Sequence, residues 1–341
     1  MELTPRKRAI LAAIVKYHIA TGAPVGSKWL TTTLENAPSS ATLRNEMSEL
    51  SSMGFLTQPH TSAGRIPTDK GYEFYVSNLM QTDEITEKEK EYIDRVLEDV
   101  SNDAENIRSI AARVLSQLTG LVTFEGRVAF ENAIIKKVQI NLLSPRLIMV
   151  VAITDDGRTK SKLLKSGTSF NDEMLCVLQK TAKEQVEGKS FKELTFAAMQ
   201  NIYAAVGLNA LEIMPVIASL FEMINEMGQS EIKYFGETNI YSMLMDSEKA
   251  SRLLMFLSKK DAVMSIVSQN DDKVGVIFGA DTLYSELDCA TIIVAPFGVN
   301  GRIGVIGPTR MSYGHIVSLT TYLAKKLSEV LDNNIKDLEE I

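Results

Sequence analysis

The chain has 341 residues, of which 45% are hydrophobic and 23% charged, and its formal net charge is −7. This length exceeds what one compact core holds, so two or three domains are expected, and the balanced composition argues against disorder along the whole chain. No stretch approaches the length of a membrane span, and the two distant cysteines, Cys176 and Cys289, suit neither a disulfide framework nor a zinc site. We expect a cytoplasmic protein.

The acidic excess lies outside the N-terminal segment. Residues 1–80 carry eight Lys or Arg against six Asp or Glu, whereas the rest of the chain is acidic overall. A slightly basic segment permits contact with nucleic acid without requiring it. Lys16 and His18 interrupt the first apolar run early, so no signal peptide is predicted.

Three helices are predicted in the first 54 residues. Thr4 and Pro5 begin the first, which Gly22 ends, and Ser27 caps a second that runs to about Leu34. The third begins after Ser39 or Ser40 and ends at Gly54, with a single apolar stripe. Its polar face includes Ser40, Thr42, Arg44, Asn45 and Ser48.

Two short strands follow, at 55–57 and 64–67, with a polar loop between them. Three helices and then a two-stranded hairpin is the order of a winged helix-turn-helix. A further helix begins at Thr68 and Asp69. Residues 81–100 are rich in charge and predict an exposed linker helix, with an apolar edge formed by Ile93, Val96, Leu97 and Val100.

The remainder alternates between strands and helices. A helix is predicted at 104–120, followed by strands at 137–141, 146–153 and 158–164. Residues 170–262 are predicted to be mostly helical, with one strand near 231–235. Three more strands, at 274–278, 291–296 and 302–306, precede a helix at 313–331 and a polar, frayed tail. We expect the strands of 137–165 and 274–307 to form one antiparallel sheet, split by a helical insertion. The fold class is therefore α+β.

The candidate binding residues lie on the third helix and on the hairpin. Short polar or bidentate side chains near the start of a helix can form hydrogen bonds to base edges. This rule favours Ser40, Thr42, Arg44, Asn45 and Ser48 as base-contacting residues. The alternative is that they form an ordinary solvated helix face. The expected backbone contacts are Lys28, His60, Ser62 and Arg65, with Arg65 at the hairpin tip beside phosphate.

Little in the chain suggests catalysis. The three histidines, His18, His60 and His315, have no metal-ligand spacing, so neither a metal nor a cofactor is expected. The glycine-rich stretch 298–304 has strands on both sides, so a hairpin turn is favoured over a nucleotide loop. We do not expect an enzyme.

Several motifs together resemble a known family. Several segments closely resemble the heat-inducible transcription repressor HrcA family, and the order of modules agrees along the whole chain. These segments are Ser40–Met47, Pro59–Thr68, Gly71-Tyr72, Phe74–Val76 and Gly304–Met311 with Tyr313. One departure is Glu73, where the family usually has a basic residue.

The resemblance implies a domain layout and a function. The layout is a winged-helix DNA-binding domain at 1–78, a linker helix at 79–103, a GAF-like domain at 104–168 and 263–341, and an inserted dimerisation domain at 169–262. The implied function is dimeric repression of chaperonin and chaperone operons through an inverted-repeat operator called CIRCE, supported by the chaperonin GroEL. The alternative is a winged-helix repressor that senses a small molecule through its GAF-like domain.

Overall fold

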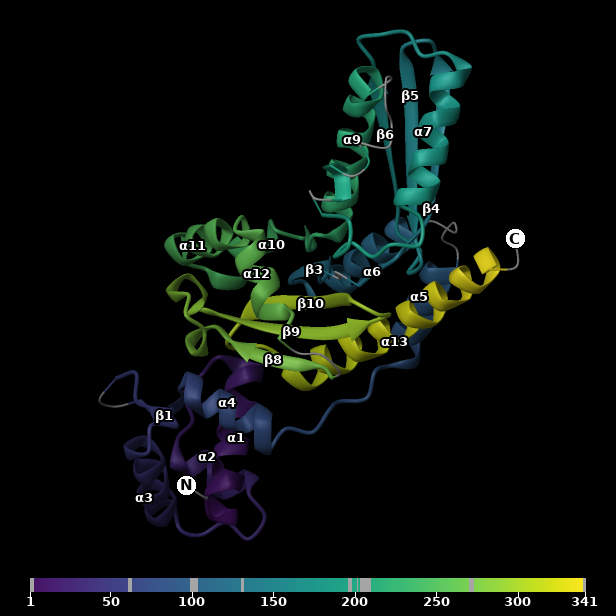
Figure 1. Cartoon of the computed structure of the whole chain (residues 1–341). Helices are drawn as coiled ribbons and strands as arrows, with labels where there is room; N and C mark the ends of the chain where they lie inside the picture. The colour runs from purple at the N-terminus through teal and green to yellow at the C-terminus, as the bar shows by residue number, and fades with distance from the viewer. Residues whose placement is uncertain are drawn as a thin grey trace. The chain divides into compact units, whose positions relative to one another are not determined.

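The computed structural model is of mixed α+β type and divides the chain into two compact units (Figure 1). The first unit comprises Met1–Gly126 and Ile232–Leu331, and the second comprises Arg127–Glu231 and Asp332–Ile341. The structure describes residues 3–60, 63–98, 104–129, 132–195, 198–200, 202, 210–269 and 273–339.

The first unit begins with the three expected helices: α1 (Pro5–Thr21), α2 (Ser27–Thr33) and α3 (Ser40–Ser52). The hydroxyl of Thr4 caps α1 and Gly22 ends it, as predicted. The prediction that Ser27 caps α2 is wrong, because Gly26 occupies that position. The Ser27 hydroxyl is instead buried, with its oxygen 2.8 Å from that of Ser40.

A two-stranded antiparallel sheet follows, formed by β1 (Leu56–Thr57) and β2 (Ile66–Pro67). Val25 adds a further antiparallel bridge, to Arg65. The helix α4 (Asp69–Asn78) comes next, capped by Thr68. This order of helices and strands is that of a winged helix.

The charged segment forms a helix, as expected, and its predicted apolar edge is buried at Ile93 and Leu97. The helix α5 (Glu87–Glu98) begins six residues later than expected and packs against α6 (Ala104–Thr119), with Ile93 and Leu97 buried in the core of the first unit. The carboxylate of Asp94 also accepts a hydrogen bond from Tyr322 at 2.9 Å. Val100, expected on the same apolar edge, lies outside the described residues.

A five-stranded sheet forms the centre of the first unit. Its order is β7 (Glu231–Phe235), β3 (Val122–Arg127), β10 (Gly301–Pro308), β9 (Ala290–Phe297) and β8 (Gly275–Phe278). Two 3-10 turns, η2 (Gly279–Asp281) and η3 (Ser285–Leu287), connect β8 to β9. Gly301 pairs with Phe297 across the β9–β10 turn, which confirms a hairpin in the glycine-rich stretch.

Helices cover both faces of this sheet, since almost every residue of β9 and β10 is buried. These helices include α6, α10 (Asn239–Leu244), α11 (Ser247–Leu257), α12 (Lys260–Val267) and α13 (Tyr313–Glu339) (Figure 1). The expected frayed tail is wrong as far as Glu339, because α13 continues to that residue.

The helices of the winged part share one hydrophobic core with this sheet. Arg310 donates to the carbonyl of Ile19 at 3.1 Å, near the carboxyl end of α1, where a positive charge suits the helix dipole. The Tyr72 ring of α4 lies 6.2 Å from that of Tyr313 on α13, and its hydroxyl lies 2.6 Å from Nδ1 of His18. These contacts give the motif at 304–313 a structural role, namely fixing α1 and α4.

The second unit contains a separate sheet of three strands, β4 (Ile135–Ser144), β5 (Leu147–Thr154) and β6 (Thr159–Lys165), in that order and antiparallel. Its described helices include α7 (Asp172–Gln185) and α9 (Ala210–Gly228). Ile148 and Val150 of the central strand share a core with Leu178 of α7 and Ile217 of α9.

The expected single sheet over 137–165 and 274–307 is therefore wrong. The strands β4–β6 bury their apolar face against α7 and α9, so they belong with those helices and not with β9 and β10. The compact units accordingly change at 126/127 and 231/232, and not at the expected 168/169 and 262/263.

Candidate nucleic-acid interface

The helix α3 presents one polar patch to solvent. Arg44, Asn45 and Ser48 are all exposed, and residues three or four apart share a helix face. The opposite side is buried and consists of Leu43, Met47 and Leu50. Arginine and asparagine make bidentate hydrogen bonds to guanine and adenine edges, and serine accepts or donates to either, so this patch has the chemistry of a base reader.

The first turn of α3 is held by hydroxyl contacts. The Ser39 hydroxyl accepts from the backbone N–H of Thr42 at 3.2 Å and lies 3.0 Å from the Thr42 hydroxyl. The Ser40 hydroxyl is paired with that of Ser27 on α2. Ser40 and Thr42, both expected to support base reading, thus secure the start of the helix beside Arg44.

The expected backbone contacts are scattered around α3. Lys28 is exposed on α2, and His60 is exposed in the loop between β1 and β2. The carbonyl of His60 accepts from the backbone of Ala63 at 2.9 Å, which closes the turn. Ser62 lies outside the described residues.

Arg65 is not at the hairpin tip, so that part of the prediction is wrong. Its backbone N–H donates to Val25 at 2.8 Å and its carbonyl accepts from Val25 at 2.9 Å, which places it in a β-bridge directly before β2. Its Nε donates to the hydroxyl of Ser51, near the end of α3, at 3.1 Å. The preceding Gly64 is required by the same approach, because a β-carbon there would lie 2.2 Å from the Val25 carbonyl oxygen.

An ion-pair cluster between α1 and α3 was not anticipated. Lys7 Nζ lies 3.0 Å from a carboxylate oxygen of Glu46 and 2.9 Å from one of Glu49, and Arg6 lies 3.7 Å from Glu46. Hydrogen bonds to Glu49 and then Glu46 raise the pKa of Lys7. Sequence spacing gave no signal for these pairs, which join residues some forty positions apart.

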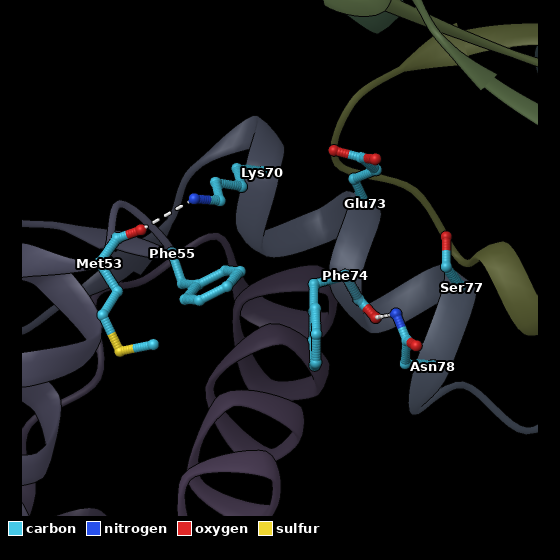
Figure 2. A pocket seen from close by; sticks show the side chains of 7 residues that line it. All are labelled: Met53, Phe55, Lys70, Glu73, Phe74, Ser77 and Asn78. Atoms are coloured by element: carbon cyan, nitrogen blue, oxygen red, sulfur yellow. Dashed lines mark hydrogen bonds between the residues drawn. The ribbon is translucent and has the colours of Figure 1, made fainter. Parts of the chain in front are cut away.

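A hollow of about 330 Å³ lies between the end of α3 and α4. Figure 2 shows its lining side chains, namely Met53, Phe55, Lys70, Glu73, Phe74, Ser77 and Asn78. Lys70 donates to the carbonyl of Met53 at 3.0 Å and lies 4.8 Å from the centre of the Phe55 ring. Phe55 meets Phe74 edge-on at 5.2 Å, so these contacts fix α4 against the end of α3.

The side of α4 that carries Glu73 is acidic. Burial, followed by the nearby Asp281, raises the pKa of Glu73. Burial likewise raises the pKa of Asp69, with Asp288 and Asp281 adding to the effect. Carboxylates that already repel one another are poor neighbours for phosphate, so the geometry favours α3 over α4 as the surface for nucleic acid.

The described residues offer neither a cluster of metal ligands nor a membrane-spanning helix. No group of three or more His, Cys, Asp or Glu side chains is arranged to hold a metal ion within the described part of the chain. Among its helices, none is both long enough and apolar enough to cross a membrane.

Comparison with known proteins agrees with this geometry. Residues 105–317 match the family model described as the HrcA protein C terminal domain. Proteins described as heat-inducible transcription repressor HrcA match over nearly the full chain. The relative from Acetivibrio thermocellus is 31% identical over 99% of both chains, and that from Clostridioides difficile is 32% identical over 95% of this chain and 98% of its own.

A solved structure shows the same fold. It is a crystal structure at 2.2 Å resolution described as a hypothetical protein, with a TM-score of 0.64 and 22% sequence identity. The match covers 98% of this chain and 100% of the other.

Proposed function

Since the chain belongs to the HrcA family of heat-inducible transcription repressors, we propose that it represses chaperonin and chaperone operons as a dimer bound to an inverted-repeat operator. The relatives are transcription repressors, a class of regulator and not of enzyme. The observation that carries the proposal is the exposed patch of Arg44, Asn45 and Ser48 on α3, beside the hairpin of the winged part.

In this proposal Arg44 and Asn45 contact base edges in the major groove, and Ser48 adds a contact one turn later. Ser40 and Thr42 support the start of the helix, whose N-terminus also favours a phosphate. Lys28, His60 and Ser62 contact the DNA backbone. Arg65 contributes mainly by holding the hairpin against Ser51 of α3.

Dimerisation is assigned to the second unit, within which lies most of the insertion expected at 169–262. Among the described residues, no helix of the shared core covers one face of its three-stranded sheet, which carries Leu147, Met149, Val151 and Ile153, all partly exposed. Leu163 on β6, opposite Met149, is 61% exposed. The neighbours of this strand on the same face, including Gln139, Asn141 and Ser161, are polar and exposed, so the apolar surface is a stripe along β5 with Leu163 beside it. An apolar stripe of this kind suits a second copy of the chain, because a two-fold axis pairs it with itself.

The five-stranded sheet with its covering helices is assigned to the GAF-like domain.

In the proposed dimer, the two copies of α3 enter major grooves that are separated by a whole number of helical turns, at about 34 Å per turn. The operator is therefore a palindrome.

Binding to a CIRCE duplex tests the DNA part of the proposal. The full chain is titrated against that duplex, against one with a single scrambled half-site, and against one with both scrambled. Each mismatch costs about 1–3 kcal/mol, so scrambling one half-site weakens binding at least a hundredfold. Equal affinity for all three duplexes contradicts the proposal.

The regulatory part, which follows from the family resemblance, concerns the chaperonin GroEL. We propose that the chaperonin raises the fraction of folded, dimeric repressor, and that heat diverts the chaperonin to unfolded proteins. Freshly refolded protein is titrated with the CIRCE duplex, with and without chaperonin. The binding-competent fraction rises when chaperonin is present, and an unchanged fraction contradicts this part alone.

A further inference from the structure

Lys7 is the only cation of α1 placed between two carboxylates of α3 in the described structure. Its ammonium group lies within 3.0 Å of both Glu46 and Glu49, and its side chain is only 15% exposed. Arg6, the neighbouring cation, is 58% exposed and lies 3.7 Å from Glu46. Lys7 is thus committed to α3.

The carboxylates of Glu46 and Glu49 lie close to the reading patch, which is the exposed group of Arg44, Asn45 and Ser48 on α3. Glu49 follows Ser48 directly and comes four residues after Asn45, so it shares their side of the helix, and its side chain is 62% exposed. Double-stranded DNA carries a negative charge about every 1.7 Å along its axis. An uncompensated carboxylate at Glu49 would therefore repel the backbone that α3 must approach.

We propose that Lys7 is a positioning residue for DNA binding, which neutralises Glu46 and Glu49 so that α3 can enter the major groove. The inference rests on the proposed function, because it assigns a role to a residue behind the reading patch. Lys7 acts through the two carboxylates and not by contact with phosphate, since both short contacts of its ammonium group are to them.

A structural role alone predicts a different outcome. If Lys7 only held α1 against α3, Lys7→Gln would lower the unfolding midpoint, because Lys7 and Glu46 are largely covered, and the folded protein would bind DNA as before. In our proposal, the loss of its charge leaves the exposed Glu49, and Glu46 behind it, without their shared ammonium group, which weakens every complex regardless of base sequence. Base-specific contacts at Arg44 and Asn45 remain, so the preference for one sequence over another is preserved.

The test compares Lys7→Gln with Lys16→Gln, which removes the same charge from an exposed position on the same helix. Affinities of the full chain are measured for the CIRCE duplex and for an unrelated duplex of equal length, at several salt concentrations. We expect Lys7→Gln to weaken both complexes about tenfold at low salt, with a smaller effect at high salt, and Lys16→Gln to change them less than about twofold.

The decisive variant adds Glu46→Gln and Glu49→Gln to Lys7→Gln. If Lys7 acts by neutralising the carboxylates, this triple variant regains affinity to within about twofold of the wild type. A triple variant as weak as Lys7→Gln, or a Lys7→Gln protein that binds like Lys16→Gln, overturns the inference.

Two controls keep the result interpretable. If Lys7→Gln fails to fold, the pair Glu46→Gln with Glu49→Gln in the wild-type background still decides, because the inference predicts undiminished affinity and a loss contradicts it. If the wild-type chain binds the CIRCE duplex no better than the unrelated duplex, the proposed function fails, whereas failure of the Lys7 variants alone leaves that function intact.

Discussion

Arg44 is the side chain on which sequence recognition depends most in this account. It is exposed at the start of α3 and bears the group that pairs bidentately with guanine. Arg44→Ala should weaken operator binding by about 1–3 kcal/mol and relax the preference at one position of each half-site. Competition binding with single-base operator variants measures both effects, with Arg95→Ala, an exposed arginine of α5, as the control.

His18 gives the fold a dependence on pH. Burial, and then the charge of Arg310, lowers the pKa of His18 below its ordinary value of 6.5. As the pH falls below 6.5, the unfolded chain takes up the proton before the folded chain does, so stability is full above this value and declines beneath it.

The variant His18→Gln removes this titration. Urea unfolding at about pH 7.5 and about pH 5.5 should show a larger loss of stability for the wild type than for the variant. An equal loss in both proteins means that His18 is not the group responsible.

At this scale the sequence predicted the types of side chain better than their positions. The exposed patch of Arg44, Asn45 and Ser48 follows from helical periodicity alone. The position of Arg65 was wrong and the Lys7 ion pairs were missed, because both depend on contacts with residues distant in the chain. Periodicity carries no information about such contacts.

At the scale of elements, close packing between α4 and the residue before β1 leaves no room for a side chain at Gly71. A β-carbon at Gly71 would lie 2.2 Å from the carbonyl oxygen of Phe55, which is backbone and also accepts from Thr68 at 3.1 Å. Gly71→Ala should therefore force α4 away from β1 and destabilise the protein by about 1–3 kcal/mol.

Thermal unfolding measures this loss. Gly167→Ala is the matched control, since no atom outside the neighbouring residues lies within 4 Å of a β-carbon at Gly167. If both variants unfold at the same temperature, a side chain at position 71 does not disturb the packing of α4, and the prediction is wrong.

Three helix starts were predictable, because Thr4, Ser39 and Thr68 cap their helices through local hydrogen bonds. The strand β3 was missed for a tertiary reason. Its residue Glu125 reads as exposed, yet it is buried and lies 3.4 Å from Arg108 of α6. A buried ion pair of this kind interrupts the apolar pattern that marks a central strand.

At the scale of the whole molecule, the sequence predicted an α+β protein with a winged helix-turn-helix order but not the division of its sheets. The strands β4 and β6 carry several lysines, whereas β8–β10 are almost entirely apolar or glycine, but neither pattern says which strands share a sheet. That pairing is decided by the helices α7 and α9, whose apolar faces cover β4–β6.

The open face of β4–β6 leads to a prediction about assembly. Met149→Lys places a charge in the centre of the proposed dimer interface, whereas Leu283→Lys changes a fully exposed leucine of the first unit. We expect Met149→Lys to sediment as a monomer and to bind the operator at least tenfold more weakly, because each protomer then reads a half-site alone. A Met149→Lys variant that remains dimeric places the interface elsewhere.

The central claim is that two copies of α3 read a symmetric pair of half-sites. Selection of bound sequences from a random duplex pool, at a fixed salt concentration and with or without the chaperonin, tests it most directly. The account predicts enrichment of one inverted repeat whose half-sites lie a whole number of helical turns apart. Enrichment of a single asymmetric site, or of no sequence under either condition, would contradict it.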